Sequence, residues 1–254
     1  MTNYRLTVQY DGTHFAGFQI QPNQPTIQGE LERALAILTK APIRIVGAGR
    51  TDAGVHAEGQ VASFKTDRLT VPVERIPAAV NSLLPPDIRV LQAEVVPNDF
   101  HACYSAVSKT YRYQVYHGAT ADVFLRRFAL WIPEPFDWQA VAKAAVLLEG
   151  THDFAGFAST GSSAKTTVRT MYRVELDTAG RVKCLRFTAN GFLYNMVRSI
   201  MGTLIEVGKG RREVESVAEV LRTGARDLAG PTAPAVGLVL ERVEYVLDTH
   251  PRVL

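Results

Sequence analysis

The sequence has little cysteine, no long apolar run and almost no excess of charge. Its two cysteines, Cys103 and Cys184, are too few for a disulfide framework or a cysteine-rich zinc site. No stretch reaches the roughly 18 consecutive apolar residues of a membrane-spanning helix. The first residues show no basic leader followed by an apolar stretch, which argues against secretion. We therefore expect a reduced, cytoplasmic protein without a membrane anchor.

What the chain does have is enough apolar sequence for a sizeable core. It contains 254 residues, of which 46% are hydrophobic and 21% are charged. There are 28 Lys and Arg residues against 25 Asp and Glu residues, so the formal net charge is +3. Disorder would need fewer apolar residues and a larger net charge. The length predicts one large domain or two small ones.

The hydrophobic pattern predicts the same order of elements in each half: strand, helix, strand, strand, helix, strand. In the first half we expect strands at 3–10, 43–46, 60–65 and 88–96, a helix between the N-cap Thr26 and Pro42, and a second helix at 75–84. In the second half we expect strands at 109–117, 169–177, 182–189 and 237–247, a helix at 137–149 capped by Asp137, and helices at 192–207 and 213–221.

This order predicts an α+β protein made of two tandem ferredoxin-like units, each a split βαβ motif like that of an RRM. Their sheets would join into one wide antiparallel sheet with helices on one face. The predicted domains are residues 1–100, which carry a glycine-rich loop, and residues 101–254, which complete the active-site cleft. A broad sheet face rimmed with Arg and Lys suits nucleic acid, although such a fold hosts many functions.

Basic residues gather in the second half of the chain. The segment from Arg181 to Arg212 holds seven basic residues and one acid, Glu206, and the segment 159–173 holds three basic residues and no acid. Such stretches suit a phosphate backbone. They are equally compatible with a solvated helix face and a cationic helix end.

The loop Gly47–Gly59 brings several glycines and charged residues together in a short segment, which makes it the first candidate site. It is not a phosphate-binding P-loop, because no Gly-Lys-Ser/Thr follows its glycines. It presents one carboxylate, Asp52, beside one guanidinium, Arg50. A carboxylate with a pKa of about 3.9 is ionised at neutral pH and can act as a nucleophile or a general base. The alternative is that Asp52 is only a turn residue, which the sequence Asp-Ala-Gly also favours.

Two other kinds of catalytic site find less support. His14, His56 and His101 could be combined with Asp52 into a metal site, but the spacing of zinc-binding motifs is absent. We therefore expect no metal. A Ser-His-Asp site is not favoured either, because the sequence contains no Gly-x-Ser-x-Gly.

Two further segments carry candidate binding residues. In the predicted strand Lys109–Tyr116, Tyr111 and Tyr113 share one face, and aromatic residues there either pack in the core or stack on a base. We assign Tyr113 to the core and Tyr111 to an active-site edge. In the segment Asn190–Arg198, Arg198 lies among apolar residues and needs a carboxylate partner if it is buried. Asp52 is the partner we predict.

Together these segments resemble the TruA family of tRNA pseudouridine synthases, nearly from end to end. The family opening is similar to Tyr10-Asp11-Gly12 with Phe15, Gly17, Phe18, Gln19 and Gln21, although Phe18 stands where tryptophan is more usual. The catalytic loop resembles Gly49–Ala57. Further matches are Phe100-His101-Ala102 with Lys109, Tyr111 and Tyr113, then Asn190–Arg198, then Thr232–Leu238, while Cys103 occupies a place often held by arginine.

The resemblance implies an isomerase that converts uridine to pseudouridine at positions 38 to 40 of the tRNA anticodon stem-loop. It implies Asp52 as the nucleophile, attacking the ribose C1′ or the uracil C6, and a homodimer that binds the L-shaped tRNA across both subunits. Because the target base must leave its stack, we expect Arg50, Tyr111 and Arg198 to contact the substrate. The predicted phosphate contacts are Lys165, Arg169, Lys209 and Arg211.

No cofactor is implied, since moving a glycosidic bond within one nucleotide needs neither electrons nor phosphate energy. Two alternatives from other classes stay open at this point. The chain could be a non-catalytic RNA-binding module with Asp52 as a turn residue, or a metal-dependent hydrolase.

Overall fold

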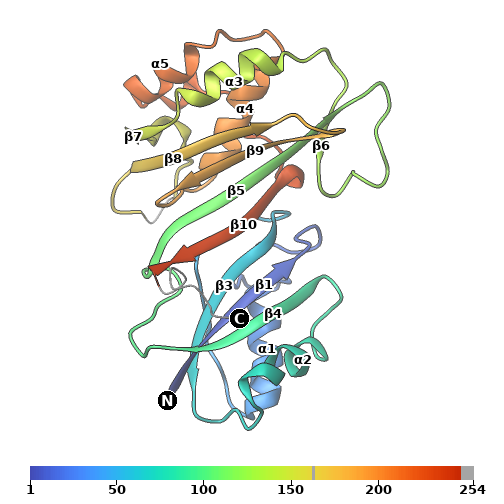
Figure 1. Ribbon diagram of the computed structural model, residues 1–254, viewed down its shortest axis with the longest axis vertical. Coiled ribbons are helices and arrows are strands. Elements are labelled where there is room, and N and C mark those ends of the chain that lie inside the picture. Colours follow the sequence, from blue (N-terminus) through green and yellow to red (C-terminus); the bar gives the residue numbers. More distant parts are fainter. Residues whose placement is uncertain (162–163, 247–254) are drawn as a thin grey trace. The chain divides into compact units, whose positions relative to one another are not determined.

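A computed structural model describes residues 1–161 and 164–246. The chain is an α+β protein with a large, mixed and mostly antiparallel sheet (Figure 1). It forms two compact units. Unit 1 is Met1–Val107 together with the described residues from Val239 onward, and unit 2 is Ser108–Leu238. The predicted domains, 1–100 and 101–254, differ from these units mainly in the place of the closing strand, and as functional domains they stay a prediction.

Unit 1 contains the predicted order of elements and adds the closing strand of the chain. Its elements are β1 (Thr2–Tyr10), α1 (Ile27–Thr39), β2 (Val46–Gly47), β3 (His56–Thr66), α2 (Ile76–Asn81), β4 (Ile88–Val96) and β10 (Leu238–Tyr245). Strand β1 pairs antiparallel with β3 on one side and β4 on the other, and β2 pairs antiparallel with β3. Strand β10 pairs with β3 in parallel.

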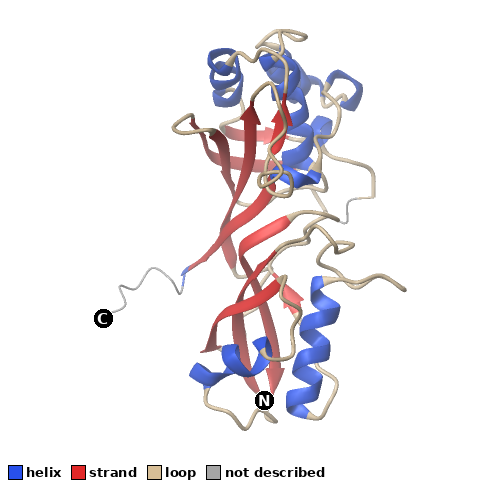
Figure 2. Cartoon of the chain, turned by 90° about the vertical axis from the view of Figure 1, so that its right-hand side faces the viewer, coloured by secondary structure: helices blue, strands red, loops and turns tan. Residues whose placement is uncertain are grey.

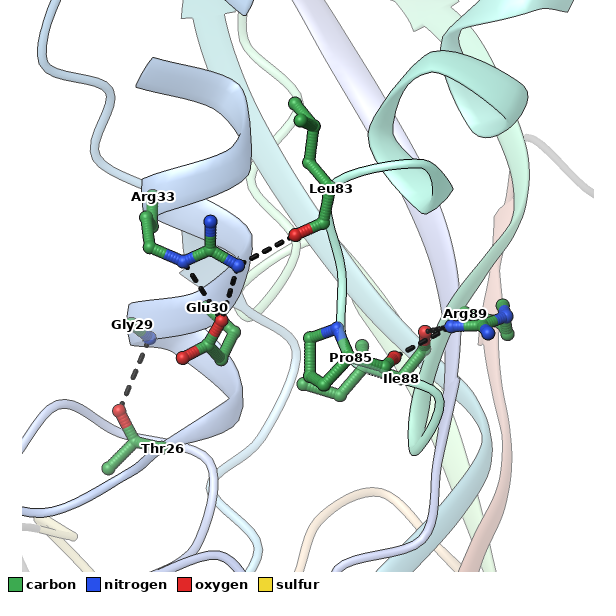
Figure 3. A network of polar contacts seen from close by, with 8 residues as sticks. All are labelled: Thr26, Gly29, Glu30, Arg33, Leu83, Pro85, Ile88 and Arg89. Carbon is green, nitrogen blue, oxygen red and sulfur yellow. Dashed lines mark hydrogen bonds and ion pairs between the residues drawn. The ribbon is translucent and has the colours of Figure 1, made fainter. Parts of the chain in front are cut away.

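Helix α1 begins where the sequence predicts. Thr26 is its N-cap, and the Thr26 Oγ1 accepts a hydrogen bond of 3.2 Å from the Gly29 N–H. One face of α1 is fully buried (Ile27, Leu31 and Leu35), and Figure 2 shows the helix alongside the strands of unit 1. On the exposed side, Arg33 bonds to Glu30 and donates to the Leu83 carbonyl oxygen at 2.7 Å (Figure 3). These contacts join α1 to the segment that follows α2.

Three predicted boundaries in unit 1 were wrong. Strand β3 begins at His56 and not at Gln60, so the last part of the glycine-rich loop is strand. The predicted strand 43–46 is reduced to β2, because Ile43 and Ile45 are buried by packing without ladder hydrogen bonds. Helix α2 ends at Asn81, three residues before the predicted end.

Unit 2 combines a second group of strands with three helices. Its elements are β5 (Ala106–His117), β6 (Leu130–Ile132), α3 (Trp138–Val146), β7 (Gly150–Asp153), β8 (Val168–Asp177), β9 (Val182–Ala189), α4 (Met196–Gly208) and α5 (Ser216–Thr223). The antiparallel order is β5-β9-β8-β7, and β6 pairs with β5 in parallel. Helix α3 contacts both α4 and β8, and α3, α4 and α5 are grouped together (Figure 1).

Unit 2 also corrects the sequence interpretation. The short strands β6 and β7 were not predicted, since three or four residues carry too little alternation. Helix α4 begins at Met196 and not at Phe192, because Asn195 has a left-handed backbone (φ 59°) that a helix cannot contain. The expectation of a purely antiparallel sheet was wrong, given the parallel pairs β3–β10 and β5–β6. Of the predicted closing strand, residue 247 lies outside the described residues.

In residues 1–161 and 164–246, no helix combines the length and the apolar character needed to span a membrane.

Candidate active site

Asp52 lies in a turn between β2 and β3 whose backbone is held on both sides. The Thr51 carbonyl oxygen accepts a hydrogen bond of 3.0 Å from the Phe18 N–H. The Asp52 carbonyl oxygen accepts one of 3.1 Å from the Val55 N–H, and Gly54 within this turn has φ 78°. The Asp52 side chain is half-buried. The turn that the sequence Asp-Ala-Gly predicts is therefore present, and it carries the Asp52 carboxylate.

The family opening segment packs directly against this loop. A Cβ atom at Gly17, which has φ +101°, would lie 2.6 Å from the Thr51 carbonyl oxygen. A Cβ atom at Gly12 would lie 2.0 Å from the Val55 carbonyl oxygen. Both positions require glycine, because backbone approaches backbone too closely for any side chain. The two glycines thus bring the residues on either side of Asp52 into contact with the segment that follows β1.

A buried polar network connects the loop to β1 and β3. The hydroxyl oxygens of Tyr10 and Thr51 are 2.8 Å apart, and the Gln60 Nε2 donates to the Gly49 carbonyl oxygen at 2.9 Å and to the Tyr10 hydroxyl at 3.3 Å. Tyr10, Thr51 and Gln60 are 3%, 5% and 0% exposed. Burial raises the pKa of Tyr10 to about 12, against the opposing effect of the bonds to Thr51 and Gln60. The sequence interpretation did not identify this network.

Arg50 and the histidines of the loop region have different surroundings. Arg50 is exposed. His56 is buried, and its Nδ1 accepts from the Gly12 N–H at 3.1 Å. His101 accepts two backbone N–H bonds within its own loop. Across the part of the chain that the structure describes, no three His, Cys, Asp or Glu side chains gather as metal ligands would, so His14, His56 and His101 do not form the metal site considered with Asp52.

In unit 2, Tyr111 lies on β5 with its ring supported from the side. Tyr111 is 7% exposed, and the Phe192 ring meets it edge-on with centroids 5.0 Å apart. Two residues along, Tyr113 is fully buried and donates to the Pro234 carbonyl oxygen at 2.7 Å. Burial raises the Tyr113 pKa, and the nearby charge of Arg198 opposes this rise. The assignment of Tyr113 to the core is confirmed.

Arg198 lies in the first turn of α4, where its side chain bridges two segments. Its Nε donates to the Ala233 carbonyl oxygen at 2.8 Å, and its Nη1 donates to the Asn195 Oδ1 at 2.9 Å. Asn195 also donates to the Ser159 Oγ at 3.0 Å. The half-buried guanidinium is therefore held in a fixed direction. The predicted pair between Arg198 and Asp52 stays a prediction.

The start of the same motif contacts the first residues of β8. Asn190 and Thr170 exchange two hydrogen bonds of 3.1 Å, one through the Asn190 side chain. A Cβ atom at Gly191 would be 3.5 Å from the Arg169 Nε, so this glycine lies against the Arg169 side chain. Partial burial lowers the pKa of Arg169, which donates to the carbonyl oxygens of Thr166 and Val168. Lys165 is exposed.

Lys209 and Arg211, the other two predicted phosphate contacts, are already paired with carboxylates. The Lys209 Nζ is 3.0 Å from the Glu134 Oε1. Arg211 is 3.6 Å from the same Glu134 oxygen and 3.3 Å from the Glu206 Oε1. The hydrogen bond from Lys209 lowers the pKa of Glu134. Much of the positive charge at the end of α4 is thus offset within the protein.

Comparison with known proteins gives the class of this protein. The family described as tRNA pseudouridine synthase matches residues 6–105 and 144–246. The chain belongs to the TruA family of tRNA pseudouridine synthases, which are isomerases. It is 50% identical over 243 residues to tRNA pseudouridine synthase A of Halalkalibacterium halodurans, covering 95% of this chain and 92% of the relative. It is 48% identical to the protein of the same name from Moorella thermoacetica, covering 95% of this chain and 98% of the relative.

One match to a solved structure is weak. A chain from a crystal structure titled as a Cbf5-Nop10-Gar1 complex matches with a TM-score of 0.34 and 12% identity, over 79% of this chain and 54% of that one. The family assignment therefore depends on the sequence relatives, and the resemblance found from the motifs is confirmed by them.

Proposed function

We propose that this pseudouridine synthase acts on uridines 38 to 40 of the tRNA anticodon stem-loop and that Asp52 is its nucleophile. The observation that carries the proposal is the position of this half-buried carboxylate in a turn fixed by hydrogen bonds at Thr51, Asp52 and Val55. An ionised carboxylate in a fixed position can attack carbon and form a covalent intermediate.

The proposed reaction balances without a cofactor. The bond between uracil N1 and ribose C1′ breaks, and a bond between uracil C5 and C1′ forms. A proton leaves C5, and N1 gains a proton, so nothing is oxidised or reduced. Asp52 attacks either C1′ or C6, and the carboxylate is released when the new glycosidic bond has formed.

The other candidate residues supply binding and orientation in this proposal. Arg50 is exposed and lies two residues before Asp52 in the chain, as suits a side chain that fills the gap left by a flipped base. Tyr111 offers a ring whose direction is fixed by Phe192 and which can stack on the base. Arg198, directed by Ala233 and Asn195, would neutralise the carboxylate.

The phosphate contacts are not equally supported. Lys165 and Arg169 have no carboxylate among the hydrogen-bond and ion-pair partners described for them, whereas Lys209 and Arg211 are ion-paired with Glu134 and Glu206. A homodimer in the cytoplasm, binding the L-shaped tRNA across both subunits, completes the proposal. Light scattering of the purified protein would test the dimer.

The test of the proposed function is to map pseudouridines in an unmodified tRNA transcript incubated with wild type, Asp52→Asn and Asp67→Asn. Asp67 is an exposed aspartate of the same unit and serves as the matched control. We expect product from wild type and Asp67→Asn, and bound tRNA without detectable product from Asp52→Asn. Full activity of Asp52→Asn would refute the nucleophile. Binding of tRNA without product by the wild type would favour the non-catalytic RNA-binding module, and cleavage of the transcript that a chelator abolishes would favour the metal-dependent hydrolase.

A further inference from the structure

We infer that Tyr10 and Gln60 are positioning residues that hold the Asp52 loop in its reactive geometry through Thr51 and Gly49. The inference rests on the proposed role of Asp52 as the nucleophile. All the groups involved belong to unit 1, and every contact between them is a hydrogen bond of 2.8–3.3 Å.

The network holds the loop at two points on either side of Arg50. Gln60, on β3, donates from one Nε2 atom to the Gly49 carbonyl oxygen and to the Tyr10 hydroxyl. The Tyr10 hydroxyl, at the end of β1, shares a hydrogen bond of 2.8 Å with the Thr51 hydroxyl. The loop segment from Gly49 to Thr51 is therefore attached to two neighbouring strands of the sheet.

This attachment restricts Asp52 because Thr51 directly precedes it. The Thr51 side chain is held by Tyr10, and the Thr51 carbonyl oxygen is held by the Phe18 N–H. On the other side, the Asp52 carbonyl oxygen is held by the Val55 N–H. The backbone of Asp52 is consequently fixed on both sides. Displacing a reacting group by 1 Å lowers the rate of the chemical step about 100-fold, so a loop that held Asp52 less firmly would be a poorer catalyst.

The composition of the network argues against a role in packing alone. Tyr10, Thr51 and Gln60 are almost completely buried. Apolar residues of similar size would fill this volume without removing three polar groups from water, which costs free energy unless every group finds a partner. Removing a single partner leaves the others unsatisfied, so the network acts as one unit.

The central test compares Tyr10→Phe with Tyr245→Phe. Tyr245 is the matched control: it is also buried in unit 1, and its hydroxyl also forms a buried hydrogen bond, to the Ala102 carbonyl oxygen. We expect similar losses of thermal stability in the two variants. We expect Tyr10→Phe to lower kcat on an unmodified tRNA transcript about 10- to 100-fold with KM changed less than about twofold, and Tyr245→Phe to leave kcat unchanged. Equal kcat values in the two variants would overturn the inference.

A second pair tests the hydroxyl at the other end of the bond. Thr51→Val keeps the shape of the side chain but loses the hydroxyl, whereas Thr51→Ser keeps the hydroxyl and loses a methyl group. A positioning role predicts a higher kcat for Thr51→Ser than for Thr51→Val, and a packing role predicts the reverse order. The reverse order would overturn the inference even if Tyr10→Phe failed to fold.

Asp52→Asn is measured in parallel. If that variant is active, the proposed function has failed; if it is inactive while Tyr10→Phe matches Tyr245→Phe, the positioning inference alone has failed.

Discussion

The Asp52 loop of unit 1 and the Asn190–Arg198 segment of unit 2 hold their charged residues in different ways. Around Asp52, the described bonds fix backbone atoms on both sides of the residue. At Arg198, they fix two guanidinium nitrogen atoms of the side chain itself, Nε and Nη1. The difference teaches that backbone fit should control the reactivity of Asp52, whereas Arg198 should contribute to the stability of unit 2 as well as to substrate binding.

The largest expected effect comes from pushing the Asp52 loop away through its backbone. In Gly17→Ala, the new Cβ atom would lie 2.6 Å from the Thr51 carbonyl oxygen, so the loop must move. We expect kcat to fall about 100-fold or more, measured on an unmodified tRNA transcript. Gly180→Ala is the control, because Gly180 also has a positive φ but would meet nothing within 4 Å. It should lose about 1 kcal/mol of stability and no activity, and equal activity of the two variants would contradict the role of backbone fit.

A smaller effect is expected from removing the side chain that bridges α4 and the segment before β10. Arg198→Ala loses the bonds to Ala233 and Asn195, and bonds from a charged group contribute about 1.5–3 kcal/mol. The melting temperature should therefore fall by several degrees, and product formation should fall with it. Arg222→Ala, on the exposed side of α5, is the control and should melt like the wild type. An unchanged melting temperature for Arg198→Ala would show that Arg198 does not stabilise unit 2 and would leave it only a role in substrate binding.

The smallest effect separates basic residues of unit 2 by their partners. Lys165→Ala removes an exposed charge and should weaken tRNA binding several-fold, with the slope of log Kd against log salt reduced by about 1. Lys209→Ala removes a charge that is already offset by Glu134 and should change the slope less. Binding titrations at three salt concentrations would measure both. A larger loss for Lys209→Ala would show that its pair with Glu134 opens on tRNA.

Much of the fold was predictable because the local signals were strong. The bounds of β4 and β9 agree with the predicted strands, and Thr26 and Asp137 cap their helices as expected. The errors occur where tertiary contacts override local pattern. Asn195 stops α4 from extending back to Phe192, and the parallel pairing of β10 with β3 joins residues far apart in the sequence.

The residues of the candidate site could be predicted from the sequence, but the hydrogen bonds that hold the Asp52 loop could not. Glycines and a lone carboxylate marked the Asp52 loop, yet nothing in the spacing placed Tyr10 beside Thr51 or Gln60 beside Gly49. The sequence did contain a signal for Gln60. It is a polar residue directly before Val61 and Ala62 in β3, and all three are buried. No comparable signal pointed to Glu134, whose carboxylate reaches Lys209 only after folding.

The return of the chain to unit 1 has a consequence for biosynthesis. Strand β10 pairs with β3 between Val239 and His56, so the two partners are separated by most of the polypeptide. The ribosome synthesises the first 107 residues long before it synthesises β10, the strand that completes their part of the sheet. Unit 1 therefore cannot reach its final form until β10 has been synthesised, and β3 lacks its parallel partner at His56 and Ala57 while unit 2 is made.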